Sequence, residues 1–225
     1  MKTPKDTEKM PQQRFLYVVF LSTPFRIGRM IRAITGYPYN HTALSLSPEM
    51  KYLYSFSRHY KNAPFYGGFT KESILRCHHG GNFAMMKICA VPIGEEEYQS
   101  AKKAIERLEK YREENIYNMI SAACFPFKKS VRIKKSFTCA EFVLSMLKKY
   151  ADIPVLKGKD FCSIKELSAV LDIYKIYEGS SEKFLENADW CGDTFPEEKG
   201  RWFYWKKTFS NNSKLAYRFV RRKKD

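Results

Sequence analysis

The residues with the clearest chemical potential lie around Cys139. Thr138 and Glu141 have the spacing of a capping box, in which each side chain bonds the backbone N–H of the other residue at the start of a helix. Phe137 and Phe142 have the spacing of the hydrophobic staple that accompanies such a box. The sequence therefore predicts a helix that starts at Thr138, with Cys139 as its first helical residue.

A thiol at this position can do nucleophilic chemistry. The first backbone N–H groups of a helix have no intrahelical partner, and they form the positive end of the helix dipole, which favours a thiolate. Lys134 and Lys135 add nearby positive charge, whereas Glu141 opposes it slightly. A thiolate is the nucleophile of cysteine hydrolases. The alternative interpretation is a cysteine that is merely tucked under a helix cap.

A thiolate nucleophile needs an acid–base partner, and the chain has four histidines. His41 begins an alternating segment, so that His41, Ala43 and Ser45 share one face of a predicted strand. Because the neighbours on this face are small, a helix end can pack closely against it. We therefore expect His41 to be the general base for Cys139. His59 lies in a segment rich in aromatic and charged residues and is less well placed.

Metal binding is not expected. His78 and His79 follow Cys77 and resemble part of a metal site, but adjacent side chains point apart and the chain has no CxxC pair. We expect no cofactor either. Most cysteines are predicted to be small buried hydrophobic residues in a reducing compartment. The six cysteines are Cys77, Cys89, Cys124, Cys139, Cys162 and Cys191.

The elements that must position Cys139 and His41 follow from hydrophobic periodicity. Strands are predicted at 15–21, 42–46, 52–57, 83–91 and 173–177, and helices at 23–35, 94–114, 138–151 and 163–171. Residues 58–82 are predicted to be a loop. The sequence Trp-Phe-Tyr-Trp at 202–205 indicates a strand or a docking segment. Strands and helices alternate irregularly, so we expect the α+β class.

Composition narrows the functional classes. The 225 residues carry a formal net charge of +16, and the 44% hydrophobic content is too high for a disordered chain. The longest apolar run, at 15–21, has seven residues, whereas a membrane-spanning helix needs about twenty. No signal peptide is evident, so a cytoplasmic location is expected. Residues 201–225 hold nine Lys and Arg residues against one Asp, which favours an anionic partner.

Two motifs together resemble a known family. YNHTALSL at 39–46 and FTCAEFVLSML at 137–147 are similar to circularly permuted papain-like hydrolases of NlpC type and, more narrowly, to their YiiX-like branch. In those enzymes the histidine strand precedes the cysteine helix. YLYSFS at 52–57 and IYNM at 116–119 also match, and the resemblance covers about 14–180. It implies a mostly antiparallel sheet packed against a central helix that carries the cysteine.

The resemblance implies roles for individual residues. Cys139 would be the nucleophile, and His41 the general base and later the general acid. Relatives place a third polar residue, often glutamate, on the next strand, and the matching position here is Ser55. A serine cannot stabilise an imidazolium as a carboxylate does, which leaves a weaker triad, another third residue or lost activity as alternatives. Tyr117, with the backbone amide of Cys139, would bind the oxyanion, and Tyr39 joins this substrate-binding set.

These residues support two functional hypotheses. The first is a cysteine peptidase or amidase that cleaves an amide or ester through an acyl-enzyme on Cys139, with a peptide, amide or acyl lipid as substrate. A lipid acyltransferase or thioesterase of the same fold is a variant of it. The second is a non-catalytic protein that binds nucleic acid or an anionic membrane through its basic tail. No obligate protein partner is evident.

The domain organisation expected from these patterns has three parts. Residues 1–13 form a flexible N-terminus, 14–180 form the hydrolase-like domain, and 181–225 form a basic, aromatic extension. The tail would serve docking or localisation, whereas the chemistry would belong to the central domain.

We predict that Cys139 is the most reactive of the six cysteines at neutral pH, because the helix start and His41 both favour its thiolate. Labelling of the folded protein with iodoacetamide, with each site located by mass spectrometry, measures the order of reaction. Earlier reaction at Cys77 or Cys162, with Cys139 inert, would contradict the assignment of the nucleophile.

Overall fold

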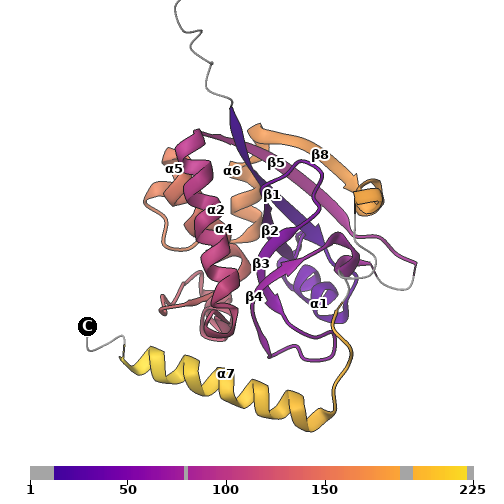
Figure 1. The fold of residues 1–225 in the computed structure, drawn as a ribbon, viewed down its shortest axis with the longest axis vertical. Coiled ribbons are helices and arrows are strands. Elements are labelled where there is room, and N and C mark those ends of the chain that lie inside the picture. The colour runs from indigo at the N-terminus through magenta and orange to yellow at the C-terminus, as the bar shows by residue number, and fades with distance from the viewer. Residues whose placement is uncertain (1–12, 79–80, 188–194, 222–225) are drawn as a thin grey trace, which may run out of the picture.

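A computed structural model describes residues 13–78, 81–187 and 195–221 (Figure 1). Within these residues the strands form one eight-stranded sheet in the order β7-β6-β4-β3-β2-β1-β5-β8. All neighbours are antiparallel except the short pair β6 and β7. The strands are β1 (Arg14–Ser22), β2 (His41–Ser45), β3 (Leu53–Arg58), β4 (Gly67–Glu72), β5 (Met85–Ile93), β6 (Ile116–Tyr117), β7 (Ser136–Phe137) and β8 (Lys175–Ser180).

The helices flank this sheet. They are α1 (Arg26–Thr35), α2 (Glu95–Lys110), α3 (Met119–Cys124), α4 (Cys139–Tyr150), α5 (Pro154–Lys157), α6 (Ile164–Val170) and α7 (Arg201–Arg221). Short 3-10 helices span Ile74–Cys77, Arg112–Glu114, Phe125–Phe127, Asp172–Tyr174 and Ser181–Asn187. The fold is therefore of the α+β class, as the sequence predicts. No helix in the described part of the chain is both long and apolar enough to cross a membrane.

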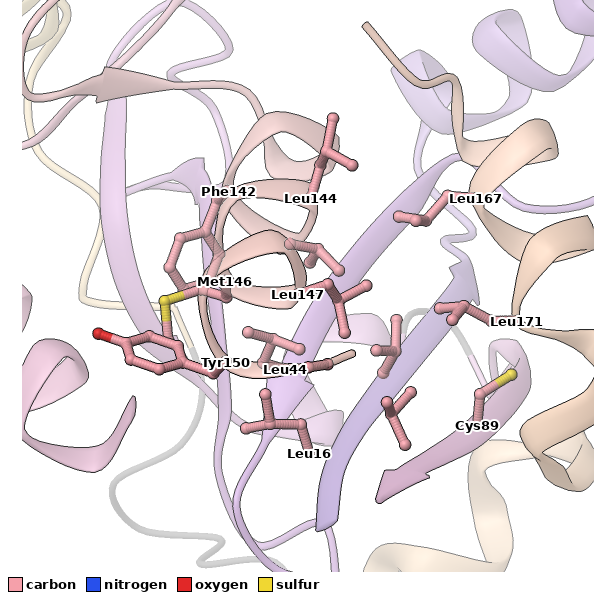
Figure 2. Close-up of a cluster of buried hydrophobic side chains, with 14 of the residues drawn as sticks. Leu16, Leu44, Cys89, Phe142, Leu144, Met146, Leu147, Tyr150, Leu167 and Leu171 are labelled. Carbon is pink, nitrogen blue, oxygen red and sulfur yellow. The ribbon is translucent and has the colours of Figure 1, made fainter. Parts of the chain in front are cut away.

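Strand β1, which lies between β2 and β5, is buried on both faces because apolar layers cover both sides of the sheet. Its side chains alternate between two clusters: Leu16, Val18 and Phe20 face the larger cluster, whereas Val19 and Leu21 face the smaller one. Figure 2 shows the larger cluster, in which residues of α4 lie beside Leu16 of β1 and Leu44 of β2. This packing holds the helix that carries Cys139 firmly against the sheet.

The start of α4 confirms the capping-box prediction. Thr138 is the N-cap, and its hydroxyl accepts a hydrogen bond from the backbone N–H of Glu141 at 3.2 Å. The carboxylate of Glu141 accepts one in return from the Thr138 N–H at 2.7 Å. Cys139 is therefore the first helical residue, with its backbone N–H at the unpaired end of the helix.

The predicted loop over 58–82 is wrong, because it contains strand β4. Gly67 and Gly68 explain why the sequence does not predict this strand, because glycine has a low strand preference. Here the glycines allow close contact: a side chain at Gly68 would collide with the carbonyl oxygen of Asn115, and one at Gly67 would meet the carbonyl of Ser57. Strand β4 therefore requires glycine at two positions, although glycine lowers the strand preference that is predicted from sequence.

The interpretation of 202–205 as a strand is also wrong, because these residues begin helix α7. Leu215 is buried against Ile116 and Ile133, and Asn211 Nδ2 donates to the carbonyl of Gly67 at 3.2 Å. Arg218 Nη1 donates to the carbonyl of Glu114 at 3.0 Å. These tertiary contacts outweigh the strand preference of an aromatic run.

We predict that Leu215→Ala lowers the free energy of unfolding by about 2 kcal/mol, because it removes a buried side chain from a small apolar cluster. Denaturant unfolding measures the change. The matched control is Val220→Ala on the exposed side of the same helix, which should alter stability by less than about 0.5 kcal/mol. Equal stability of wild type and Leu215→Ala would show that this contact does not hold α7 in place.

Candidate active site

The structure brings together the two residues that the sequence pairs. Cys139 lies at the start of α4, and His41 is the first residue of β2, the strand beneath that helix. The thiol of Cys139 lies close enough to the imidazole of His41 for their interaction to help raise the pKa of His41. Only 8% of Cys139 is exposed. A thiol and an imidazole in contact inside the protein are the minimal components of cysteine-based nucleophilic catalysis.

The residue before His41 fixes the start of its strand. The side-chain oxygen of Asn40 accepts hydrogen bonds from the Thr23 backbone N–H and from Arg32, each at 2.8 Å. Its amide nitrogen donates to the Thr23 hydroxyl, also at 2.8 Å. Gly28 of α1 makes room for this network, because a side chain there would collide with Thr23. These hydrogen bonds connect α1 to the start of β2 beside the imidazole of His41.

The third residue of the site is Glu72, which the sequence reasoning missed. His41 Nε2 donates to a carboxylate oxygen of Glu72 at 2.8 Å, and Glu72 is buried at the end of β4. Because Nε2 faces Glu72, Nδ1 is the ring nitrogen that remains for Cys139. Glu72 is the only acidic residue between Glu49 and Glu95, a signal that could have identified it.

Ser55, expected to orient the imidazole, instead supports the carboxylate. Its hydroxyl donates to Glu72, and the hydroxyl of Ser57 donates to the other carboxylate oxygen at 3.2 Å. Thr70 joins the two serines, at 3.1 Å from Ser55 and 2.9 Å from Ser57. The orienting group therefore lies one strand further along the sheet than the family pattern predicts, and it is a carboxylate.

The His41–Glu72 pair is charged at neutral pH. Burial works against charge on both groups, but the Glu72 charge and the hydrogen bonds with Cys139 and Glu72 raise the pKa of His41 to about 10. Burial likewise disfavours the carboxylate, but the charge of His41, aided by Arg76 and Ser55, lowers the pKa of Glu72 to about 2. A cationic imidazole beside a thiol is the arrangement required for a thiolate–imidazolium pair.

Tyr117 is also at the site. It lines the same cavity as Cys139, and burial, together with the negative charges of Cys139 and Glu141, raises its pKa above the ordinary range. The phenol therefore keeps its proton and can donate a hydrogen bond. Tyr39 is placed elsewhere: it is buried in the larger core cluster and donates to Glu178 at 2.6 Å.

Cys139 and His41 open into a cavity of about 380 Å³. Its lining is mostly apolar and includes Phe25, Ile27, Met30, Ile31, Phe56, Phe65, Met119 and Phe195. Two cations also line it: the guanidinium of Arg58 lies 4.1 Å from the ring centroid of Phe25, and that of Arg76 lies 4.8 Å from that of Phe195. The cavity therefore suits a substrate with a substantial apolar part.

The other described histidines and cysteines form no comparable centre. Burial, with the nearby charges of Arg112, Arg76 and Lys207, lowers the pKa of His59 to about 4. Burial raises the pKa of Cys89 to about 12 and that of Cys162 to about 11. Among the described residues no three His, Cys, Asp or Glu side chains are grouped as metal ligands. His79 and Cys191 lie outside the described residues.

No protein-family model, curated protein or solved structure matches this chain. The resemblance to permuted papain-like hydrolases is therefore a hypothesis based on the motifs around His41 and Cys139. The geometry of these residues with Glu72 is independent of that hypothesis.

We predict that Glu72→Gln destabilises the protein in a pH-dependent way. The raised pKa of His41 contributes stability that is complete below about pH 6.5 and lost as pH rises through about 10. The lowered pKa of Glu72 contributes stability that is complete above about pH 4.5 and lost as pH falls through about 2. The decrease in the free energy of unfolding should therefore be largest, about 3 kcal/mol, between about pH 4.5 and about pH 6.5, where both contributions are complete. Unfolding measured from pH 4 to about pH 10 tests this window.

The matched control is Glu109→Gln, which breaks the exposed contact with Lys71 at 3.6 Å and should cost less than about 1 kcal/mol at every pH. A loss for Glu72→Gln that is equally small at every pH would show that the buried pair is not charged.

Proposed function

We propose that this protein is a cysteine hydrolase that cleaves an ester or amide bond through an acyl-enzyme on Cys139. The observation that carries the proposal is the buried chain of contacts from Cys139 through His41 to Glu72 at the wall of a cavity. A nucleophile, a base and a group that orients the base are the components of acyl transfer by a covalent route. The apolar lining of the cavity favours an acyl group as the part of the substrate that it binds.

The first half-reaction forms the acyl-enzyme. The sulfur of Cys139 attacks the carbonyl carbon while its proton resides on His41, and the carbonyl oxygen becomes an oxyanion. The backbone N–H of Cys139 and the hydroxyl of Tyr117 are the available donors to that oxygen. His41 then gives its proton to the leaving alkoxide or amine, and the carbon–oxygen or carbon–nitrogen bond breaks. The products of this step are a thioester on Cys139 and a free alcohol or amine.

The second half-reaction regenerates the thiol. His41, now neutral, removes a proton from water, and the resulting hydroxide adds to the thioester carbonyl. Collapse of this intermediate breaks the carbon–sulfur bond and releases a carboxylic acid. Glu72 stays ionised throughout and stabilises the imidazolium each time it forms, while Ser55 and Ser57 hold the carboxylate in place.

Acyl transfer to an alcohol or amine is a variant of the same mechanism. It shares the acyl-enzyme and differs only in the acceptor of the second half-reaction. Apolar cavity walls limit the access of water to the thioester, and this favours transfer to another acceptor over hydrolysis. Adding an alcohol or amine acceptor to a hydrolysis assay separates the two activities, because only transfer yields a new ester or amide.

We predict that p-nitrophenyl esters acylate Cys139, and that the rate rises with acyl chain length because the cavity is apolar. A burst of nitrophenol and a mass increase on Cys139 measure the reaction. Cys139→Ala should abolish the burst, and His41→Ala should slow it roughly 100- to 10,000-fold.

The matched control is Cys124→Ala, which removes a cysteine outside the cavity and should leave the burst unchanged. The substrates should also include acyl thioesters and peptide anilides. The proposal fails if folded protein shows no acylated Cys139 with any of these compounds.

A further inference from the structure

Helix α7 presents two different faces. One face docks on the body of the protein through Leu215, Asn211 and Arg218, as described above. Figure 1 shows the helix, in yellow, lying across one end of the molecule. The chain has three tryptophans, and two of them, Trp202 and Trp205, lie on this helix. The helix is therefore held in place from below while its outer face carries unusually large side chains.

The outer face carries an apolar stripe, which Ser213 and Ala216 interrupt between Phe209 and Val220. Its members are Trp202, 69% exposed, Trp205, 70%, Phe209, 66%, and Val220, 61%. At 100° per residue these four side chains lie within about 60° of one another around the helix axis. No contact within the described protein covers them to a substantial extent. Such a stripe of exposed large apolar side chains indicates a binding surface rather than scattered exposure.

The same helix is strongly basic. Residues 201–221 contain six Lys and Arg residues and no acid. Lys206, Lys214 and Arg221 follow one border of the stripe when the helix is drawn at 100° per residue. The Lys206 ammonium lies 5.3 Å from the ring centroid of Trp202, and the Arg221 guanidinium lies 4.7 Å from that of Tyr217. An apolar stripe beside a row of cations is complementary to a partner that has negative charge at its surface and an apolar layer beneath it.

An anionic membrane has both properties. Tryptophan, with an apolar ring and one N–H donor, favours the boundary between headgroups and acyl chains. Amphipathic helices with lysine or arginine beside tryptophan, phenylalanine and leucine lie in this boundary. A nucleic acid would use the cations and could stack on separate rings, but it offers no counterpart for an aliphatic residue aligned with them, such as Val220. The stripe therefore favours lipid over nucleic acid.

We propose that α7 lies in the interface of an anionic membrane. The stripe of Trp202, Trp205, Phe209 and Val220 enters the boundary of the acyl chains, and the neighbouring cations bind lipid phosphates. The docked face keeps the protein body attached to the helix.

The candidate active site is close to the start of this helix. The ring of Tyr60 contacts those of Phe203 and Tyr204, with centroid distances of 5.6 Å and 5.4 Å. Phe65, a few residues after Tyr60, and Phe195, shortly before α7, both line the cavity of Cys139. A membrane-bound α7 thus holds the cavity near lipid, which suits an acyl-lipid substrate; this last point alone rests on the proposed function.

Vesicle binding tests the proposal. Wild-type protein should co-sediment with vesicles of phosphatidylcholine containing about 30% phosphatidylserine at least about tenfold more tightly than with pure phosphatidylcholine, and less so as salt increases. Lipids brominated on the acyl chains should quench the tryptophan fluorescence, because the rings lie about 5–10 Å deep in the interface. Cys139→Ala should bind equally, so that failure of membrane binding and failure of catalysis are separate results.

Variants assign the binding to α7. The triple variant Trp202→Ser, Trp205→Ser, Phe209→Ser should lower affinity at least about tenfold. Lys206→Glu with Lys214→Glu should remove the preference for phosphatidylserine. Both variants keep Leu215 and Arg218, and unfolding curves check that they are folded. The matched control, Ile173→Ser with Ile176→Ser, removes two exposed apolar side chains outside α7 and should leave binding unchanged.

Two results would overturn the proposal. One is an absence of wild-type binding to phosphatidylserine vesicles at low salt. The other is binding that neither brominated lipid nor the triple variant affects, together with tight binding of single-stranded RNA oligonucleotides, which would identify nucleic acid as the partner of the basic face.

Discussion

The site depends on a buried ion pair between His41 and Glu72. Each charge is costly to bury alone, so each is retained only because the other lies 2.8 Å away and the serine hydroxyls satisfy the carboxylate. The pair brings the ends of β2 and β4 into a fixed relation across β3. It also keeps a positive charge at the one point where α4 delivers Cys139. Fold and candidate chemistry therefore share the same electrostatic constraint.

The parts of this site that could be predicted are those encoded by short-range patterns. The capping box around Cys139 specifies a helix start within four residues, and the alternation after His41 specifies a strand. The pairing of β4 with β3 could not be predicted in this way, because it depends on contacts between distant residues and on two glycines with low strand preference. Glu72 was missed for that reason, and Ser55 was chosen because it lies on the adjacent strand.

The same limit applies to the C-terminal region. The aromatic run at 202–205 has a high strand preference, and only the contacts of Leu215, Asn211 and Arg218 with the body explain why the segment is helical. The basic composition of this region was visible in the sequence, but the separation of a docked face from an exposed stripe is a property of the helix geometry. Once that geometry is known, the catalytic and the binding hypotheses describe different surfaces of one molecule and no longer compete.

The close contact at Gly68 determines how far β4 lies from the segment that carries Tyr117. Gly68 of β4 pairs with Ile116, and the neighbouring Phe69 N–H donates to the carbonyl of Asn115 at 2.9 Å. Strand β4 ends at Glu72, and Ile116 precedes Tyr117, so this backbone contact joins the strand that carries Glu72 to the segment that carries Tyr117. Because Gly68 has no side chain, the separation of the two backbones at this point is set by the backbone groups themselves. Any larger residue at position 68 would push the two segments apart, and Glu72 would then move away from Tyr117 although neither residue had been changed.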